Sequence, residues 1–457
     1  MACEERGIDS NTFLFITTIS MAKRERFQTP AGMRDILPAE QRLWKLFAEY
    51  AASVGSSYGF ERIDTPIVEF SDLFRKGTGE GTDIVQKEMF SFATKGGDEL
   101  TLRPEGTPPV IRAYLEHGME KWTLPVKLFY LGPMFRHEKP QAGRRRQLHQ
   151  FGVESIGEGD PVRDVQVMQV FFAILSKLKI TDVRMELNTI GCSTCRPKYV
   201  RALKEYYRNH LKQVCADCRV RYKTNPLRLL DCKDEKCQRV KVSAPQMLDY
   251  LCEECRNHFK GVLELLDAVE IPYMLNPHLV RGLDYYTRTV FEIFQGEVSA
   301  DPLQDAQKRL ALAGGGGYDG LVKMLGGKDT PAVGGAMGIE RVLAIVAGRS
   351  QEEYEYPGRA RVFIVQLGGM AKKRALVFME ELRGANIKAG EAFGRESITA
   401  QLKVANKMGA DLAIILGQKE VLDNVAIIRE MDTGSQEIIP MAKLLDEIKK
   451  RLKKKSA

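Results

Sequence analysis

The sequence predicts a fold of mixed helices and strands, built as two to four domains, of which the last is a separate α/β domain. Its 457 residues exceed the roughly 100–200 residues of a single domain. Helical periodicity and a strand hairpin dominate the first half, whereas short strands and helices alternate after residue 360. With 44% hydrophobic and 28% charged residues, the composition excludes a disordered chain.

The elements of the N-terminal half follow from apolar spacing and from two prolines. Pro38 marks the start of a helix, and Pro66 places its strand at an edge or an interface of a sheet. The expected elements are a helix over 38–58, a strand over 60–70, strands over 126–132 and 148–157, and a helix over 163–178. The second and third strands flank a long basic loop over 137–147, which predicts a hairpin whose loop does more than turn the chain.

A cysteine-rich section follows this half. Eight of the nine cysteines lie between residues 192 and 255, so we expect a distinct insertion over about 180–258. Their spacing predicts two candidate zinc sites, the first from Cys192, Cys195, Cys215 and Cys218 and the second from Cys232, Cys237, Cys252 and Cys255. Zinc bound there would be structural, and reduced free thiols are the alternative in a cytosolic chain.

The second half continues with apolar and glycine-rich segments and then a linker. A glycine run spans 313–320, and a helix is expected over 336–348. The segment 348–359 is charged and contains Pro and Gly, which is typical of a linker. Beyond it, the pattern predicts strand, helix, strand, helix, two strands and a last helix, which together form an independent α/β domain over 360–457.

No part of the sequence predicts a membrane segment, because no apolar run approaches the ~20 residues that a bilayer requires. Residues 13–20 are apolar, but Glu4 and Glu5 occupy the place of the basic residues of a secretory signal. A second Met at position 21 opens a basic run, so residues 1–20 are expected to be a misassigned start or a disordered extension. We therefore predict a cytoplasmic protein. Its net charge of +8 is compatible with a nucleic-acid partner or with simple solubility.

Four arginines in or beside the hairpin loop form the first candidate site. They are Arg136, Arg144, Arg145 and Arg146, and Glu154 lies on the outgoing strand. Guanidinium groups donate two parallel hydrogen bonds to phosphate oxygens, so the cluster is suited to a nucleoside triphosphate. A solvated basic loop is the structural alternative.

Three further segments carry candidate residues. Arg281, Tyr285 and Tyr286 precede an alternating strand, and two adjacent tyrosines of an extended chain point to opposite faces. The glycine run allows close approach of the backbone to a ligand or a strand, but it matches no phosphate-binding loop. The glycines at 334–338 precede a helix that carries Arg341, and helix N-termini favour anions. Each segment also fits an ordinary structural role, as a strand edge or a packed core helix.

Taken together and in order, these segments resemble histidyl-tRNA synthetases of the bacterial type, a family of class II aminoacyl-tRNA synthetases. The matching motifs are FQTPAGMRDILP (27–38), LRPEGT (102–107), FYLGPMFRHEKPQ (129–141), HQFGVE (149–154), RGLDYYTRTVFE (281–292), GGYDGL (316–321) and GGAMGIERVL (334–343). The resemblance extends from about residue 23 to the C-terminus.

The resemblance implies an α+β catalytic core over 21–347, in which helices flank the antiparallel class II sheet. The core would form a homodimer through about residues 38–70, the insertion over 180–258 would lie over the tRNA acceptor arm, and 360–457 would bind the anticodon. The implied reaction joins L-histidine to histidine tRNA through histidyl-adenylate. It consumes ATP with Mg²⁺ and releases AMP and pyrophosphate.

The resemblance also assigns four arginines to ATP. Arg136 and Arg281 would be catalytic and grip the α-phosphate, and Arg281 would occupy a place that a metal ion fills in sister enzymes. Arg144 and Arg341 would hold the distal phosphates. Fixed cations of this kind would stabilise the charge that develops on the phosphate oxygens.

The histidine site implied by the resemblance has ten members. They are Glu105, Gly106, Thr107, Arg136, Gln150, Glu154, Arg281, Tyr285, Tyr286 and Tyr318. Glu154 and Tyr286 would bond the two imidazole nitrogens, since neutral imidazole has one N–H donor and one acceptor. Glu105, Thr107 and Gln150 would surround the α-ammonium group, and Tyr285 and Tyr318 would complete the walls.

Two residues of the hairpin loop and two departures from the family pattern complete the comparison. Lys139 and Gln141 match positions that face the extra 5′ guanosine of histidine tRNA. The family usually has Arg where this chain has Gly317, and an aromatic residue that stacks on adenine where it has Leu148. Leucine can still cover a base, so we expect weaker ATP binding at most.

Two non-catalytic relatives are the alternatives to an enzyme. The regulatory subunit of the phosphoribosyltransferase that starts histidine biosynthesis usually lacks the anticodon domain and degrades the arginine positions, whereas this chain has 360–457, Arg136 and Arg281. A regulatory domain that senses uncharged tRNA would accompany a kinase domain, and the chain has no HRD or DFG signature. The sequence therefore favours the enzyme.

Overall fold

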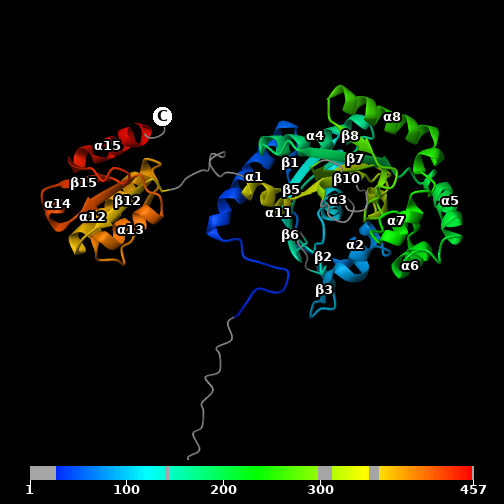
Figure 1. The fold of residues 1–457 in the computed structure, drawn as a ribbon, viewed down its shortest axis with the longest axis horizontal. Helices are drawn as coiled ribbons and strands as arrows, with labels where there is room; N and C mark the ends of the chain where they lie inside the picture. Colours follow the sequence, from blue (N-terminus) through cyan, green and yellow to red (C-terminus); the bar gives the residue numbers. More distant parts are fainter. Residues whose placement is uncertain (1–26, 140–143, 297–310, 349–359, 455–457) are drawn as a thin grey trace, which may run out of the picture.

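Figure 1 shows the computed structural model, in which an N-terminal body and a C-terminal domain each have their own sheet. The structure describes residues 27–139, 144–296, 311–348 and 360–454. The start over 1–20 and nearly all of the predicted linker lie outside the described residues. None of the described helices has the length and apolar character needed to cross a membrane.

An eight-stranded sheet organises the N-terminal body. Its order is β1-β5-β6-β11-β10-β9-β7-β8, and all pairings are antiparallel except those of the edge strands β1 and β8. The strands are β1 (Glu61–Arg62), β5 (Val126–Phe135), β6 (Gln147–Ile156), β7 (Val183–Thr189), β8 (Tyr273–Leu275), β9 (Thr287–Gln295), β10 (Ala311–Gly317) and β11 (Ala332–Gly338). The predicted hairpin is β5 and β6, which pair from Val126 opposite Ile156 to Phe135 opposite Gln147.

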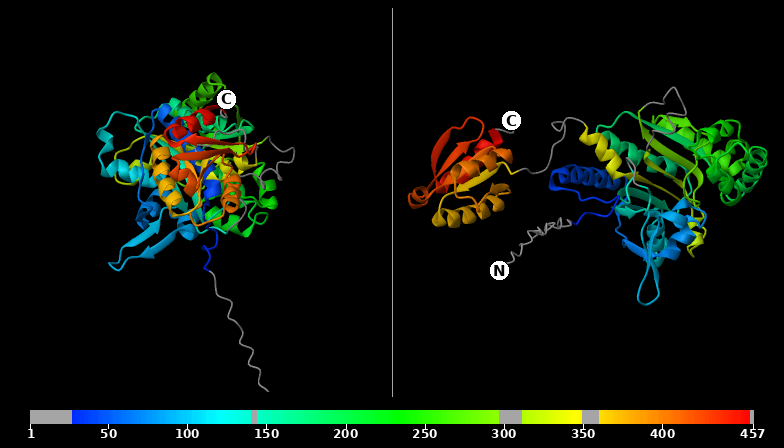
Figure 2. Two further views of the ribbon diagram at one scale, coloured as in Figure 1. Left: turned by 90° about the vertical axis from the view of Figure 1, so that its left-hand side faces the viewer. Right: turned by 60° about the horizontal axis from the view of Figure 1, so that its bottom comes forward.

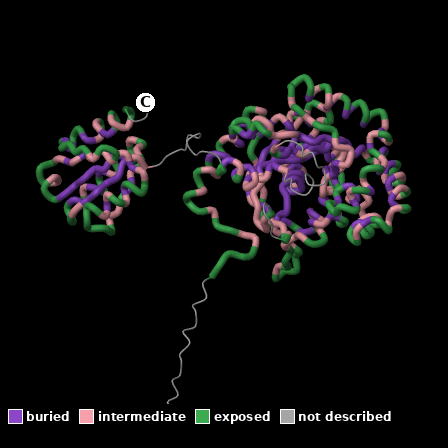
Figure 3. The backbone as a smooth tube through the Cα atoms, viewed as in Figure 1, coloured by how far each residue is buried: buried purple, intermediate pink, exposed green. Residues whose placement is uncertain are grey.

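Helices cover one face of this sheet, and the other face carries the candidate site. The covering helices are α1 (Pro38–Ser57), α4 (Pro161–Lys177), α8 (Glu253–Ala268) and α11 (Ile339–Ala347). They share a buried core with Phe129, Phe151 and Phe291 of the sheet. Figure 3 shows that the strands are largely buried. The predicted α+β class, an antiparallel sheet with flanking helices, is confirmed.

Two predicted elements of the body have different extents. The strand over 60–70 divides into β1 and β2 (Val68–Phe70), which belong to different sheets, because Pro66 between them cannot donate to a strand ladder. The remaining elements of this part are α2 (Ser71–Thr78), β3 (Phe90–Ala93), β4 (Glu99–Leu102) and α3 (Thr107–Glu116). The helix expected over 336–348 begins only at Ile339, since the glycine-rich residues before it form β11 between β6 and β10.

The insertion begins later than the sequence indicated, and α8, which spans its predicted end, belongs to the helices that cover the main sheet. β7 lies in the main sheet beside β9, so the insertion follows Thr189 and does not start near residue 180. Its helices are α5 (Arg196–Arg208), α6 (Ala216–Thr224) and α7 (Glu235–Lys241), and α8 continues past residue 258. The right-hand view of Figure 2 shows these green helices grouped at one side of the body.

The C-terminal domain has the predicted alternation of strands and helices. Its sheet has the order β13-β12-β14-β15-β16 and its own apolar core. The elements are β12 (Val362–Gln366), α12 (Gly369–Gly384), β13 (Ala389–Glu391), α13 (Ile398–Lys407), β14 (Leu412–Leu416), α14 (Gln418–Leu422), β15 (Val425–Glu430), β16 (Gln436–Pro440) and α15 (Met441–Lys454). Only the short α14 and β16 were not predicted.

Candidate active site

The four arginines assigned to ATP from the sequence meet at one place. A cavity of about 600 Å³ is lined by Arg136, Arg144, Arg281 and Arg341. Arg145 also lines it, and five arginines face three glutamates, so positive charge is in excess. A neighbouring cavity of about 390 Å³ has the same four arginines in its lining and extends to residues of the insertion. The larger cavity has the size of a nucleotide site.

The backbone fixes two of these arginines from different elements. Arg136 follows β5, and its Nε donates to the carbonyl oxygen of Pro104 over 2.9 Å. Arg341 lies in the first turn of α11, and its Nη1 donates to the carbonyl oxygen of Ala311 over 2.6 Å. Burial and the guanidinium groups of Arg136 and Arg144 lower the pKa of Arg341. Like charges held this close favour the binding of an anion between them.

Arg281 is held by an acid, an aromatic ring and a glycine. It forms an ion pair with Glu292 of β9, and its guanidinium lies 5.6 Å from the centroid of the Tyr286 ring. Burial alone would lower the pKa of Arg281, but the Glu292 carboxylate together with Tyr286 and Tyr285 outweighs burial and raises that pKa. A Cβ at Gly314 would lie 2.6 Å from Arg281 Nη1, so only glycine leaves room for this side chain. Gly314 of the glycine run therefore leaves the space that the Arg281 side chain occupies.

Glu154 lies fully buried on β6, on the face of the sheet opposite the one that α1, α4, α8 and α11 cover, where α3 packs. Thr107 Oγ1 donates to one carboxylate oxygen over 2.7 Å, and the Tyr318 hydroxyl donates to the other. Burial raises the pKa of Glu154 to about 8. A carboxyl group of this kind, held by hydroxyl groups in a buried site, is typical of a functional position.

Glu105 is the second buried acid of the site, at 4% exposure. The hydroxyl groups of Thr78 and Tyr285 each donate to it over 2.7 Å. Burial raises the pKa of Glu105 as well. Both acids thus have hydroxyl donors as hydrogen-bond partners, and the guanidinium groups of Arg136 and Arg281 oppose the rise in the pKa of Glu105.

Three tyrosines pack around these acids. The ring centroid of Tyr285 lies 4.7 Å from that of Tyr286 and 5.8 Å from that of Tyr318. Our expectation that Tyr285 and Tyr286 point to opposite faces of a strand is wrong, because β9 begins only at Thr287 and the two residues lie in the turn before it. The turn brings both rings to the same side.

The acids and tyrosines form a closed layer beside the arginine-lined cavity. Neither arginine-lined cavity has Glu105, Glu154 or the three tyrosines in its lining. The two parts adjoin through the contact of Arg281 with Tyr286 and through Gln150, which lines the larger cavity. The buried Oε1 of Gln150 has no hydrogen-bond partner among the described residues. The residues predicted to bind histidine and ATP are therefore neighbours, but Glu154 and Tyr286, which were predicted to bond the imidazole, are enclosed.

The sequence analysis missed three residues of this site. Tyr130 is buried against Gly106, where a Cβ would overlap its ring, and against Gly152, its partner in the β5–β6 register. A tyrosine opposite a glycine in the predicted hairpin could have indicated this position. Glu292 lay within a quoted motif, but its ion pair with Arg281 is not visible in spacing. No feature of the sequence indicated a role for Thr78.

The remaining predicted residues lie in different surroundings. Lys139 is exposed, and Gln141 lies outside the described residues. Leu148 lines the larger cavity, where an adenine ring would need cover. Gly317 lies instead beside a small pocket with Arg288 and Asp319, so this departure from the family pattern lies away from the arginine-lined cavities.

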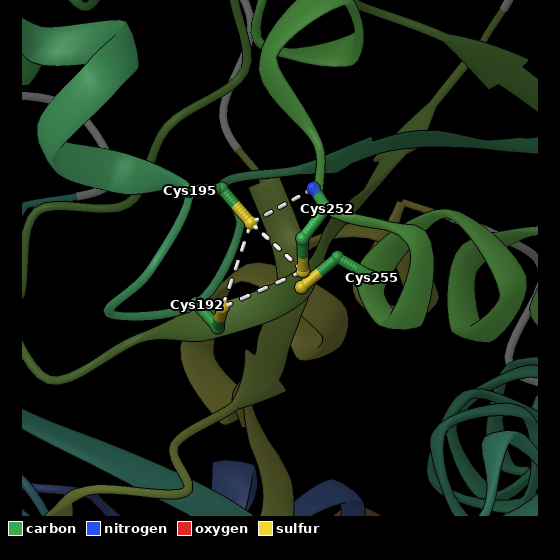
Figure 4. A group of neighbouring side chains, drawn as sticks. All are labelled: Cys192, Cys195, Cys252 and Cys255. Atoms are coloured by element: carbon green, nitrogen blue, oxygen red, sulfur yellow. Dashed lines mark hydrogen bonds between the residues drawn. The ribbon is translucent and has the colours of Figure 1, made fainter.

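The predicted pairing of the cysteines is wrong. The groups that meet are Cys192, Cys195, Cys252 and Cys255 (Figure 4), and Cys215, Cys218, Cys232 and Cys237. The first group joins the two ends of the insertion, because β7 and α8 return the chain to the same part of the body. Sequence spacing predicted pairs that are adjacent along the chain, whereas the fold nests one group inside the other.

Replacing Gly334 with alanine should destabilise the N-terminal body by about 1–3 kcal/mol. A Cβ there would overlap Glu154 Oε2 and lie 2.6 Å from the carbonyl oxygen of Val153, so backbone must move. Gly320→Ala is the matched control, because nothing lies within 4 Å of its Cβ position. Urea unfolding of both variants checks this, and equal unfolding midpoints would contradict it.

Comparison with known families decides between the readings of this site. A family model described as histidyl-tRNA synthetase matches residues 32–342, and one described as anticodon binding domain matches residues 361–451. The chain belongs to the histidyl-tRNA synthetase family. A histidine–tRNA ligase of Dehalococcoides mccartyi is 46% identical over 426 residues, which cover 93% of this chain and 100% of that protein. One of Desulforamulus reducens is 42% identical, with 92% of this chain and 99% of that protein covered.

Solved structures agree with this membership of the histidyl-tRNA synthetase family. The crystal structure of apo S. aureus histidyl-tRNA synthetase has a TM-score of 0.76 and 32% identity, and covers 92% of this chain and 99% of that one. A Bacillus halodurans structure titled as an ATP phosphoribosyltransferase regulatory subunit/histidyl-tRNA synthetase has a TM-score of 0.61 at 20% identity. That likeness concerns the fold alone.

Proposed function

We propose that this chain ligates L-histidine to histidine tRNA in an ATP-dependent reaction through histidyl-adenylate, with release of AMP and pyrophosphate. The observation that carries the proposal is the meeting of Arg136, Arg144, Arg281 and Arg341 at a nucleotide-sized cavity beside two buried acids. Membership of the histidyl-tRNA synthetase family supports the same reaction.

In the first step, a carboxylate oxygen of histidine attacks the α-phosphorus of ATP, and the bond to pyrophosphate breaks. Arg136 and Arg281 grip the α-phosphate, while Arg144 and Arg341 hold the distal phosphates. The guanidinium groups of Arg136, Arg281 and Arg341 are fixed before the reaction by backbone and side-chain contacts, so they stabilise the developing charge without reorganisation. In the second step, a ribose hydroxyl of the terminal adenosine attacks the adenylate carbonyl, and AMP leaves.

Histidine is recognised through the hydrogen-bonding pattern of its ring. Glu154 and Tyr286 bond the two imidazole nitrogens, and Tyr285 and Tyr318 form the walls. A site built to bond both nitrogens can reject an analogue that lacks one by a factor of ~10⁴ or more. The hydroxyl-only partners of Glu154 support this role, because no described cation forms an ion pair with its carboxyl group, which can still accept from an N–H donor.

The α-ammonium group of histidine sits among Glu105, Thr107 and Gln150. The burial of Glu105 supports this assignment, since a buried carboxylate is stabilised by a cationic partner. Gly106, between Glu105 and Thr107, has no side chain, so the backbone there can lie close to the ligand. The unpartnered Oε1 of Gln150, beside the cavity, is a suitable acceptor for the same ligand.

ATP enters with Mg²⁺, for which the cavity offers oxygen ligands. Glu138, Glu292 and Glu340 line it, and carboxylates are the protein ligands that Mg²⁺ prefers. The ion would neutralise phosphate charge and orient the leaving pyrophosphate.

The proposal includes an organisation around tRNA. Residues 21–347 form the catalytic core, 348–359 a linker and 360–457 the anticodon-binding domain. The insertion lies over the acceptor arm, and Lys139 and Gln141 face the extra 5′ guanosine. The protein is a homodimer through residues 38–70 and is cytoplasmic.

A charging assay tests the proposed function. Purified protein should form acid-precipitable [³H]histidyl-tRNA only when ATP, Mg²⁺, histidine and histidine tRNA are all present. The closest controls are another amino acid and a tRNA with a different anticodon. Charging of either control at the histidine rate, or no charging at all, would overturn the proposal.

A further inference from the structure

The eight cysteines of the insertion form two groups of four sulfur atoms. In the first, Cys192 Sγ lies 3.5 Å from Cys195 Sγ and 3.9 Å from Cys252 Sγ, and Cys195 Sγ lies 3.4 Å from Cys252 Sγ. Cys255 completes the group, in which all four atoms lie within 4.8 Å of one another (Figure 4).

These distances match a tetrahedral metal site. Zn–S bonds of about 2.3 Å in a tetrahedron place the sulfur atoms about 3.8 Å apart. A disulfide would require about 2.05 Å, and the described cysteines are all free. The second group behaves alike, with Cys215 Sγ 3.8 Å from Cys232 Sγ and with Cys218 and Cys237 within the same 4.8 Å limit.

Backbone amides donate to the sulfur atoms in both groups. In the first, the amides of Thr194 and Cys252 donate to the sulfur atoms of Cys192 and Cys195 over 3.4 and 3.3 Å. Such amides orient metal-bound thiolates and are a regular part of their surroundings.

In the second group, the amide of Cys218 donates to Cys215 Sγ over 3.4 Å, and that of Cys215 donates to Cys237 Sγ over 3.2 Å. Two compact groups of four cysteines, each with backbone amides donating to its sulfur atoms, are the arrangement of closed Cys₄ structural sites.

We propose that these groups bind two structural zinc ions, which hold the insertion against residues 281–288 of the active site. The first ion would join the end of β7 to the start of α8 and so close the insertion at its base. The second would tie α6 to α7 within it. The proposal rests on the cysteine geometry and is independent of the proposed function.

Residues next to the first site hold the active-site segment directly. Arg196 follows Cys195, and its guanidinium donates to the carbonyl oxygens of Tyr286 and Asp284. Glu254 lies between Cys252 and Cys255 in the sequence, and its carboxylate accepts from the Arg288 guanidinium. The first ion would thus fix groups on both sides of the turn that contains Tyr285 and Tyr286.

Residues near the second site hold the other part of the same segment. Arg228 donates to the carbonyl oxygen of Gly282 over 3.1 Å, and Asn225 Nδ2 donates to Asp284 Oδ1 over 2.6 Å. Both lie between Cys218 and Cys232. Loss of either ion should therefore loosen residues 281–288, although none of the described cysteines lines either arginine-lined cavity.

Metal analysis of the purified full-length chain tests the sites. We expect about two zinc ions per chain, because each Cys₄ set binds one ion. Cys252→Ser and Cys232→Ser should each retain one ion, and Cys3→Ser, the ninth cysteine, should retain both. Fewer than one zinc ion per wild-type chain, or iron in place of zinc, would overturn the proposal even if no serine variant folds.

Hydrogen exchange tests the coupling to the active site without any assay of activity. Removal of zinc by a chelator should accelerate amide exchange in residues 281–288 by about tenfold or more, as expected when local contacts open. Amides of the C-terminal strand β14 are the internal control. Unchanged exchange at 281–288 after complete zinc loss would contradict the coupling. A chain that holds two zinc ions but charges no tRNA would instead count against the proposed function alone.

Discussion

Replacing Arg281 with alanine should lower histidine-dependent exchange of pyrophosphate into ATP by about 10²–10³-fold. The guanidinium group faces the arginine-lined cavity, and its charge would act on the α-phosphate as the transition state forms. Histidine binding should largely persist, because the ring contacts come from Glu154 and Tyr286. The exchange assay needs no tRNA, so the loss would report the first chemical step.

The control for this variant is an arginine outside the site. Arg374→Ala removes a partly exposed arginine of α12, which pairs with Glu381 in the C-terminal domain. Its exchange rate should match that of the unmodified protein. Normal exchange by the Arg281 variant would show that the assigned role is wrong.

Replacing Glu154 with glutamine should raise the KM for histidine by about 10–100-fold, the effect expected when a hydrogen bond to a charged group is lost. The amide keeps the size of the carboxyl group but has one acceptor oxygen in place of two, so it cannot accept from Thr107, Tyr318 and an imidazole N–H as the carboxyl group can. The KM for ATP should change little, since the arginines are untouched. Steady-state exchange kinetics separate the two constants.

Glu116→Gln on α3 provides the matched control, because Glu116 is exposed and pairs only with Arg112 among the described ion pairs. A thermal scan should show both variants folded. Equal increases in the KM values for histidine and ATP would mean that Glu154 supports the whole site and does not read the ring.

The order of elements could be predicted from the sequence because it depends on local signals, whereas the meeting of the four arginines was implied by the resemblance to histidyl-tRNA synthetases. Apolar periodicity marked α1, α4 and the β5–β6 hairpin, and the motifs placed Arg136 and Arg281 beside strands of one sheet. The C-terminal domain followed from simple alternation. The periodicity and the alternation are each encoded within a short window of residues.

Features that depend on distant contacts could not be predicted in this way. The cysteines of the first group come from opposite ends of the insertion, and no spacing rule identifies partners about 60 residues apart. The assignment of β7 to the main sheet likewise depends on its pairing with β9. Tyr130 and Thr78 join the acids only through the folded register, so their roles were missed.

A crystal structure of the protein with histidine and a non-hydrolysable ATP analogue tests the central assignment most directly. The imidazole should lie between the Glu154 carboxylate and the Tyr286 hydroxyl, with the α-phosphate within hydrogen-bond distance of Arg136 and Arg281. An imidazole bound outside the acid–tyrosine layer, or an α-phosphate away from both arginines, would contradict it.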